Sequence, residues 1–372
     1  MRNSFIREKS KLLYIGVKVI TLLLSILFYS CKGQENKLVI DEPENELSDS
    51  IIKKSTNDNT SQNTFPFLNN DVQISNVVRK IFQDSKGNIW FGTENGAFVY
   101  NGEILLPIDS IISELGKGVT IKDIAEAKSG EIWFAHTDGI SSFNGKVVKN
   151  YYKSDGLISN DVWCIETDSK GNVWVGTSEG ACVFDGKKIT PFQLPEGEID
   201  KDFGISTTKM IHKIVEDSKG KLWFCTNAGL YSYTNQKLEN ESQKLGIKTN
   251  FVNGIYESKK GGFWISTKEG LYRLNKKSLE NITKDKIILG KGIGSVSEDK
   301  HGNLWLVSNQ HDLYVYDDKN LTDIKKDENN KRPVVFQIYN DQTNRLWFVG
   351  FGGAYRFEND KFINITKNGP WE

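Results

Sequence analysis

The sequence predicts an all-β protein that folds as a seven-bladed β-propeller of four-stranded antiparallel blades, and two observations support this prediction. The first is a repeat marked by seven of the nine tryptophans, which recur at spacings of 41–49 residues: Trp90, Trp133, Trp174, Trp223, Trp264, Trp305 and Trp347. The second is that turn residues alternate with strand-like runs of β-branched and aromatic residues throughout each repeat, without helical periodicity. Four short strands per repeat of this length are typical of a propeller blade.

The expected strands follow one another in a fixed order within each repeat. The first contains two apolar residues three positions apart, as in VRKIFQD (78–84). After a turn comes a second strand such as IWFGT (89–93), and then a third such as GAFVY (96–100). An Asn-Gly or Asp-Gly pair, which favours a tight hairpin, precedes the last short strand in several repeats.

The turn before the tryptophan carries the most regular motif of the chain. It reads DSKGNIWFGT at 84–93, DSKGNVWVGT at 168–177 and DSKGKLWFCT at 217–226. A phosphate-binding loop would need Gly-Lys-Ser/Thr at the start of a helix, and a calcium loop would need several alternating oxygen ligands. The aspartate also lies three residues before the glycine, whereas sialidase-type Asp-boxes place it two before. We therefore interpret the motif as structural: the aspartate caps the turn, the glycine supplies positive φ, and the tryptophan packs between blades.

The N-terminal region predicts export and a lipid anchor. A basic start and the apolar run Val19–Tyr29 have the form of a signal peptide, which we assign to residues 1–30. Cys31 follows small Ser30, as in the lipobox of bacterial lipoproteins, so we expect lipidation of Cys31 and attachment to the membrane. An ordinary signal peptide or an uncleaved anchor are the alternatives. Residues 31–70 are polar and predict a disordered tether, and residues 71–368 are assigned to the propeller.

Composition and motifs narrow the functional classes. The formal net charge is zero, which gives no electrostatic reason to expect nucleic acid as a partner. The four histidines show no metal-ligand spacing, and no hydrolase motif occurs, so we expect no metal, no cofactor and no catalytic residues. Cys164 and Cys182 are expected to lie a strand apart, too far for a disulfide, and Cys225 is expected to be a buried thiol.

The residues that differ between repeats predict a binding site. If the first strand of each blade is innermost, the residues after its first apolar position line the channel mouth: Arg79, Lys122, Trp163, His212, Asn253, Gly294 and Phe336. The two aromatic rings could stack on a sugar or another flat face, and the two cations could hold a carboxylate or sulfate. Tyr152 and Arg332, in linkers above the mouth, are further candidates. The alternative is that these positions vary because packing in the channel is loose.

Repeat three carries a resemblance to a known family through Asp155-Gly156-Leu157, Ser159-Asn160, Val162, Ile165, Asp168, Gly171, Trp174 and Gly176-Thr177. This pattern resembles the two-component regulator propeller repeat, and the resemblance covers about residues 70–366. It implies a ligand-binding sensor domain of the kind found in the periplasmic regions of hybrid histidine kinases. Repeat two departs most, with Ala127 in place of the aspartate and Ala135-His136 in place of Gly-Thr.

Three functional hypotheses follow from the sequence. The first is a lipid-anchored recognition module of the periplasm, outer membrane or cell surface, which binds a small molecule, glycan or peptide at the channel mouth. The second is a scaffold that holds an envelope protein on the propeller rim. The third is a lyase or hydrolase that uses His212 with an acidic residue of a neighbouring blade. Ring closure also has two solutions, either a final blade completed by Lys361–Thr366 or a latch strand near Phe65–Phe67.

Overall fold

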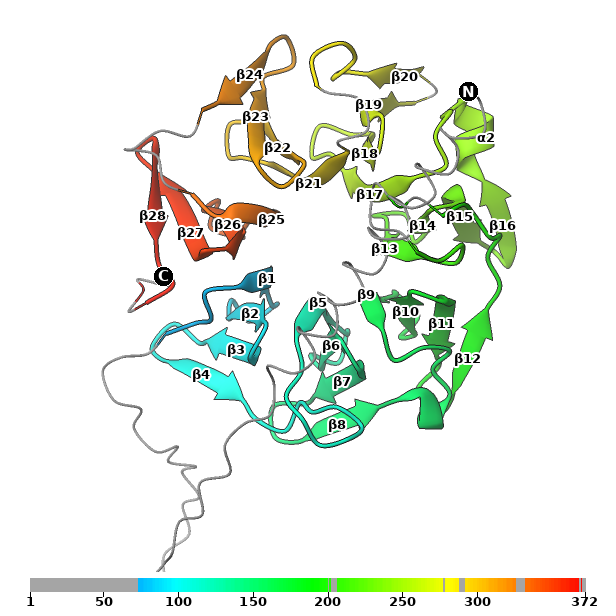
Figure 1. The fold of residues 1–372 in the computed structure, drawn as a ribbon, viewed down its shortest axis with the longest axis vertical. Coiled ribbons are helices and arrows are strands. Elements are labelled where there is room, and N and C mark those ends of the chain that lie inside the picture. Colours follow the sequence, from blue (N-terminus) through cyan, green and yellow to red (C-terminus); the bar gives the residue numbers. More distant parts are fainter. Residues whose placement is uncertain are drawn as a thin grey trace, which may run out of the picture. The chain divides into compact units, whose positions relative to one another are not determined.

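The computed structural model describes residues 73–367, except 200, 202–205, 277, 288–291 and 326–331, and also residue 369. The chain divides into two units, Met1–Phe65 and Pro66–Glu372, and every described residue belongs to the second. Seven four-stranded antiparallel sheets surround a central axis in this unit, so the predicted propeller is confirmed (Figure 1). The signal peptide, Cys31 and the tether lie outside the described residues. Within the described ranges, no helix is both long and apolar enough to cross a membrane.

The first four blades follow one another along the chain. Blade 1 contains β1 (Val78–Gln83), β2 (Ile89–Thr93), β3 (Gly96–Tyr100) and β4 (Leu105–Ile108). Blade 2 contains β5 (Ile121–Glu126), β6 (Ile132–His136), β7 (Gly139–Phe143) and β8 (Val148–Tyr151). Blade 3 contains β9 (Val162–Thr167), β10 (Val173–Thr177), β11 (Gly180–Phe184) and β12 (Ile189–Phe192). Blade 4 contains β13 (Ile211–Glu216), β14 (Leu222–Thr226), β15 (Gly229–Thr234) and β16 (Lys237–Asn240).

The last three blades repeat this arrangement. Blade 5 contains β17 (Val252–Glu257), β18 (Phe263–Thr267), β19 (Gly270–Asn275) and β20 (Ser278–Asn281). Blade 6 contains β21 (Ile293–Glu298), β22 (Leu304–Ser308), β23 (Asp312–Tyr316) and β24 (Leu321–Ile324). Blade 7 contains β25 (Val334–Asn340), β26 (Leu346–Phe351), β27 (Gly353–Glu358) and β28 (Lys361–Asn364). Two short helices lie in linkers between blades, a 3₁₀ turn at Lys153–Asp155 and α2 at Glu241–Leu245.

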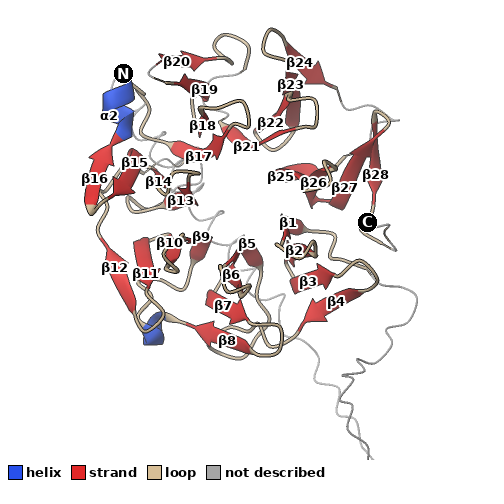
Figure 2. Cartoon of the chain, turned by 180° about the vertical axis from the view of Figure 1, so that it is seen from behind, coloured by secondary structure: helices blue, strands red, loops and turns tan. Residues whose placement is uncertain are grey.

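Each blade is a meander in which sequence neighbours pair side by side. The first strand lies next to the axis and the fourth lies at the perimeter, as the view from behind also shows (Figure 2). The second strand is buried along its whole length in five blades, and in blade 7 it is buried up to its last residue, because neighbouring blades cover both of its faces. Linkers between blades therefore carry the chain from the perimeter of one blade back to the axis for the next.

The repeated turn holds the tryptophan by a hydrogen bond that the motif alone did not reveal. One oxygen of Asp84 accepts from the backbone N–H groups of Lys86 and Asn88, at 3.0 and 2.9 Å. The other oxygen accepts from the indole Nε1 of Trp90 at 2.9 Å, and Gly87 has φ of 90°. The same aspartate-to-indole bond, at 2.8–3.0 Å, joins Asp168 to Trp174, Asp217 to Trp223, Asp299 to Trp305 and Asp341 to Trp347. The structural interpretation of the motif is thus supported.

The tryptophan then packs against the following blade. The ring of Trp90 lies 5.8 Å from that of Phe134 in blade 2, and Trp174 lies 5.6 Å from Phe224 in blade 4. Between blades 7 and 1, Trp347 lies 6.3 Å from Phe91. Large flat side chains fill the wedge-shaped space between adjacent sheets and bury much apolar surface. The hydrophobic clusters accordingly span pairs of blades, and the fold closes as a ring of such contacts.

A second set of polar contacts links the turns of neighbouring blades. The N–H and hydroxyl of Ser85 both donate to the carboxylate of Glu126, at 2.7 and 2.6 Å. The same pairing joins Ser169 to Glu216 and Ser218 to Glu257. At the closing seam, the N–H of Gln342 donates to the side-chain oxygen of Gln83 at 2.7 Å. The serine of the motif therefore acts between blades.

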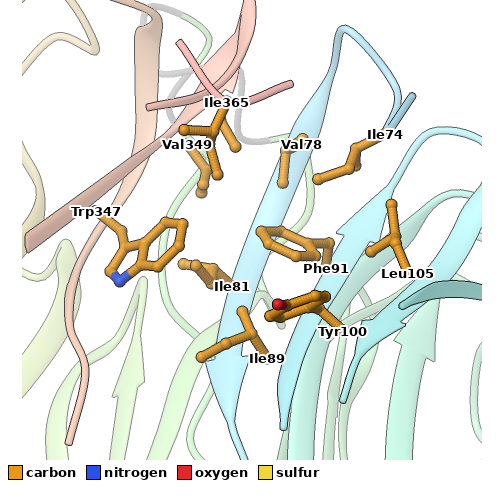
Figure 3. Packing of buried hydrophobic residues seen from close by; sticks show 11 residues of the cluster. Ile74, Val78, Ile81, Ile89, Phe91, Tyr100, Leu105, Trp347, Val349 and Ile365 are labelled. Carbon is orange, nitrogen blue, oxygen red and sulfur yellow. The ribbon is translucent and has the colours of Figure 1, made fainter. Parts of the chain in front are cut away.

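The ring closes without exchange of a strand, because C-terminal residues complete blade 7. The N–H of Ile74 donates to the carbonyl of Thr366 at 2.9 Å, and the N–H of Gly352 donates to that of Asn76 at 2.8 Å. The side chains of blades 7 and 1 meet in one buried cluster that includes Ile74, Val78, Trp347, Val349 and Ile365 (Figure 3). The segment near Phe65–Phe67 lies outside the described residues.

Blade 2 departs from the repeat at the positions that the sequence singled out. With Ala127 in the turn, the buried indole Nε1 of Trp133 has no hydrogen-bond partner among the described residues. His136 replaces the threonine that caps the next turn in blades 1, 3, 4 and 5, and its Nδ1 accepts from the N–H of Asp138 at 3.3 Å. Its Nε2 lies 3.0 Å from the hydroxyl of Ser141. Burial lowers the pKa of His136 to about 4, so the ring is neutral and its role is structural.

We predict that removing the aspartate-to-indole hydrogen bond from blade 3 destabilises the protein and that introducing one in blade 2 stabilises it. Asp168→Ala leaves a buried indole donor unpaired and should lower the free energy of unfolding by about 2 kcal/mol. Ala127→Asp gives Trp133 a partner within a turn of the same backbone hydrogen bonding and should raise it by about 1 kcal/mol. Urea denaturation followed by tryptophan fluorescence measures both.

The matched control is Asp185→Ala, which removes an exposed turn aspartate bonded to two backbone N–H groups but to no indole. Its effect should be smaller than that of Asp168→Ala. Equal losses for the two variants, or a loss of stability in Ala127→Asp, would contradict the importance of the indole bond.

Candidate functional site

A β-bulge places the predicted mouth residues in the channel. In blade 1, Val78 pairs with Thr93 and Lys80 with Gly92, so Arg79 is an extra residue in β1. A bulge interrupts the alternation of a strand and lets two consecutive side chains face the same side. The extra residues of the other blades are Lys122, Trp163, His212, Asn253, the pair Gly294 and Ser295, and Phe336. The bulge therefore falls at every position that the sequence assigned to the mouth.

These residues line one cavity along the axis. Its volume is about 480 Å³, which is within the range of small-molecule sites. Its charged lining residues come from blades 1, 2 and 4, and they are Arg79, Lys80, Lys122, Asp123 and Lys213. The facing wall comes from blades 5 to 7, and its uncharged residues include Asn253, Gly254, Gly294, Ser295, Phe336 and Gln337. The cavity thus has one charged wall and one neutral wall.

Two pairs of a cation and an aromatic ring stand at the mouth. The ammonium of Lys122 lies 4.0 Å from the ring centre of Trp163, whose exposed fraction is 42%. The carboxylate of Asp161 holds both residues, at 2.5 Å from the Lys122 Nζ and 3.0 Å from the Trp163 Nε1. In the second pair, the guanidinium of Arg79 lies 5.0 Å from the ring centre of Phe336. These rings are oriented by their cations, which favours stacking of a flat ligand.

Phe351 extends the second pair onto the surface, and sequence reasoning missed it. Its ring lies 4.8 Å from that of Phe336, and 45% of the residue is exposed. It occupies the end of β26, where the other repeats carry the polar residue of a turn. This aromatic residue at a position that is polar in the other repeats could have identified Phe351 as a candidate from the sequence.

Below the mouth lies an ion trio that the sequence did not predict. Asp123 is 3% exposed, and its two oxygens contact the ammonium of Lys80 at 2.7 Å and that of Lys213 at 3.1 Å. The backbone N–H of Ile165 also donates to Asp123, at 3.3 Å. The sequence could have predicted the bulge, because two buried apolar residues three positions apart do not fit a strand of period two without one, but it could not have predicted which of these charges are in contact.

The two lysines control the ionisation of Asp123. Burial opposes its charge, but the ammonium groups of Lys213 and Lys80 hold its pKa at about 2. The pKa of Lys80 is lowered, chiefly by burial. A single carboxylate between two ammonium groups leaves one positive charge without a counter-ion in the trio.

Glu166 is an acidic group that interacts with the residues of the trio. Burial raises its pKa to about 7, against the attraction of the nearby Lys213 and together with repulsion from Asp123. Glu166 lies on β9, three residues after Trp163, and its Oε1 accepts from the N–H of Thr167 at 3.1 Å. Near neutral pH this group is therefore partly protonated.

We predict that Asp123→Asn destabilises the fold by about 3 kcal/mol or more, because two buried ammonium groups lose their counter-ion. The folded pKa of Asp123 lies below the ordinary value of 3.8, so its ionisation stabilises the protein at pH 7 and this contribution is lost as pH falls from about 4 to about 2. In thermal melts, the difference in stability between the two proteins should therefore be smaller at pH 3 than at pH 7.

Asp161→Asn is the matched control, since its side chain is 45% exposed and paired with one lysine. It should change stability by no more than about 1 kcal/mol. Equal losses in the two variants would contradict a special role for the buried trio.

His212 stands at the mouth without an acidic partner. Its Nε2 has no hydrogen-bond partner, and it forms no ion pair with a carboxylate among the described residues. Burial lowers its pKa to about 4, so the imidazole is neutral at physiological pH. A pairing of His212 with an acidic residue, as the lyase hypothesis requires, is not formed in this part of the chain.

Tyr152 and Arg332, the candidates in the linkers, do not line the cavity. The hydroxyl of Tyr152 donates to the carbonyl of Ile112 at 2.8 Å, in the preceding linker. The buried guanidinium of Arg332 donates to the carbonyls of Ile324 and His311, at 2.6 and 3.0 Å. Both side chains are held by backbone acceptors and tie linkers to blades. The sequence indicated that both residues lie in linkers above the mouth, but it did not indicate where their side chains point.

The described cysteines carry no reactive thiol. Cys164, Cys182 and Cys225 are buried and free, as expected. Burial raises the pKa of Cys164 to about 12, so it remains protonated beside the trio.

Comparison with known proteins shows similarity to a propeller repeat and to solved propeller structures. The family model of the two component regulator propeller matches residues 73–95 and 156–179, which contain Arg79 and Trp163. These two segments of the chain are therefore similar to the two component regulator propeller repeat. No curated protein sequence matches the chain.

Solved structures that share the fold of this propeller include proteins of several kinds. The extracellular domain of a B. thetaiotaomicron protein described as a one component system has 21% sequence identity and a TM-score of 0.60, with coverage of 76% of this chain and 39% of that chain. A virginiamycin B lyase from Staphylococcus aureus has 14% identity and a TM-score of 0.57, with coverage of 76% and 96%. YCF48 bound to the D1 peptide has 10% identity and a TM-score of 0.54, with coverage of 77% and 94%. At these identities the likeness concerns the fold.

Proposed function

We propose that this two-component regulator propeller is a recognition module of the cell envelope that binds a small molecule, glycan or peptide at the channel mouth. The observation that carries the proposal is the convergence of the bulge residues of all seven blades on one cavity of about 480 Å³. The framework repeats from blade to blade, whereas these residues differ. A ring of different side chains on a rigid scaffold suits specific recognition.

The mouth provides the contacts that a ring-shaped ligand needs. Trp163 presents a partly exposed indole whose edge is fixed by Asp161, so its free face is available for stacking. Phe336 and Phe351 form a second aromatic surface on the opposite side. Polar groups from Asn253 and His212 stand between the two surfaces. Stacking supplies affinity, and the polar groups between the rings supply orientation.

The envelope location rests on the N-terminal sequence. A signal peptide over residues 1–30 and lipidation of Cys31 would anchor the module in the membrane, with residues 31–70 as a tether. The likeness to an extracellular domain of a regulatory system supports the same location and a sensor-like role. This chain spans 39% of that structure, so signalling itself would require further protein segments or a partner.

A lyase is the second candidate, because virginiamycin B lyase shares the fold and His212 stands at the mouth. The neutral imidazole could serve as a general base only if a substrate or a side-chain movement supplied the remaining groups. Because His212 has no carboxylate partner among the described residues, we favour ligand recognition over a lyase activity.

We predict that Trp163→Ala weakens ligand binding about tenfold or more, since stacking on an indole contributes on the order of 1–2 kcal/mol. The full-length chain is first screened by thermal shift against metabolites, oligosaccharides and peptides, and hits are titrated by calorimetry. The control is Ile104→Ala, an exposed apolar residue in a turn of blade 1 outside the cavity lining.

Equal loss of affinity in both variants, or hits unaffected by either, would contradict the channel mouth as the site. Absence of any hit together with a co-purifying envelope protein would favour the scaffold. Turnover of a hit that is abolished by His212→Ala would favour the lyase.

A further inference from the structure

The cavity carries more positive than negative charge. Four cations line it, namely Arg79, Lys80, Lys122 and Lys213, whereas one carboxylate, Asp123, does so. Asp161 and Glu94 pair with Lys122 and Arg79 from the rim, where their side chains are 45% and 41% exposed. Exposed pairs are screened by water and neutralise a buried charge only weakly. Among the described residues, Lys80 and Lys213 form ion pairs with Asp123 and not with a carboxylate of the rim.

The excess charge is located at the trio. Lys80 and Lys213 share Asp123, so one ammonium charge has no counter-ion in a buried position. Glu166 is the group that could balance it, but its carboxyl is partly protonated near neutral pH because of burial. A buried charge without a partner is costly, and a bound anion would remove that cost.

Space for an anion lies on the facing wall. Gly254 occupies the position at which blades 1, 2 and 4 carry the charged residues Lys80, Asp123 and Lys213. A methyl group built on Gly254 would meet no atom within 4 Å, so that part of the wall borders open space. The neutral wall carries hydroxyl and amide groups from Ser295 and Gln337 in place of carboxylates, and therefore would not repel an anion.

Unpaired donors at the mouth point to the same class of ligand. The Nε of Arg79 and the Nε2 of His212 are buried and have no hydrogen-bond partner among the described residues. Both side chains line the cavity, so a small rotation of either would present an N–H group to an acceptor there. Carboxylate and sulfate groups offer several acceptor atoms and negative charge together.

Resting on the proposed function, we propose that the ligand is a cyclic compound with one oxyanion group, a carboxylate or a sulfate. The oxyanion occupies the axis in front of Lys213 and Lys80, and the ring stacks on Trp163. In this arrangement the oxyanion balances the excess positive charge and occupies the open space at Gly254. It also accepts hydrogen bonds from Arg79 and His212.

Glu166 makes this binding depend on pH. The charged or titratable groups that face it are Lys213 from β13, Asp123 from β5, Lys80 from β1 and Cys164 from its own strand. When Glu166 is ionised it competes with the oxyanion for Lys213, and when it is protonated the positive charge is free. Binding should therefore strengthen as pH falls from about 8 to about 6.

The test uses the full-length chain and a matched series of probes: galacturonate, galactose 6-sulfate and galactose, each as monosaccharide and short oligomer, and cyclohexanecarboxylate with its neutral amide. Binding is measured by calorimetry at pH 6 and pH 8. We expect the anionic members to bind at least about tenfold more tightly than their neutral counterparts. Comparison of galacturonate with galactose 6-sulfate shows which oxyanion is preferred.

Lys213→Met should abolish the preference for anions, and we expect it to fold because Asp123 can still pair with Lys80. The matched control Lys188→Met removes an exposed lysine of a turn in blade 3 and should leave the preference unchanged. Glu166→Gln should bind anions at pH 8 as tightly as the parent does at pH 6. Thermal melts confirm that each variant is folded.

The outcomes separate this inference from the proposed function. Neutral probes that bind as well as anionic ones, and lose affinity in Trp163→Ala, would overturn the anion preference and leave channel recognition intact. Anion binding unchanged in Lys213→Met would overturn the place assigned to the oxyanion. No binding by any probe at either pH would overturn the inference, while hits in the wider screen would still support recognition at the mouth.

Discussion

The hydrogen bond from the tryptophan indole to the turn aspartate is the contact on which this propeller depends. It satisfies a buried donor and, at the same time, fixes the plane of the ring that fills the wedge between blades. In blade 5 the turn carries Ser258 in place of the aspartate. The indole of Trp264 instead donates to Glu298 of blade 6 at 3.0 Å, so the neighbouring blade supplies the acceptor. In blade 2 the indole Nε1 of Trp133 has no hydrogen-bond partner in the described part of the chain, and the ring stacks on that of Tyr151 at 5.6 Å.

The bulge in each innermost strand separates the framework from the site. Residues on both sides of it, such as Val78 and Ile81 in blade 1, are buried between blades, whereas Arg79 and Lys80 face the channel. A strand without the bulge would present alternate residues and could not bury both apolar positions. Because the site lies on paired strands rather than on loops, its side chains keep their places when the rim varies.

The fold could be predicted almost completely from the sequence, and the site only in part. Tryptophan spacing gave the number of blades, and the variable position after the first apolar residue identified the ring from Arg79 to Phe336. Tyr152 and Arg332, the further candidates in the linkers, do not line the cavity, because nearby backbone carbonyls bind their polar ends. Phe351 was missed, since the repeat predicted a turn residue at its position.

Local sequence determined the blades, their strand order, the turn chemistry and the position of the mouth, because these follow from hydrogen-bond partners and side-chain periodicity within about 40 residues. Only the tertiary structure decided which charges meet in the channel. Asp123 contacts Lys213 from a position 90 residues away, and also Lys80 from the blade before its own. Those contacts depend on how closely the closed ring brings its innermost strands together, and no local pattern encodes that distance.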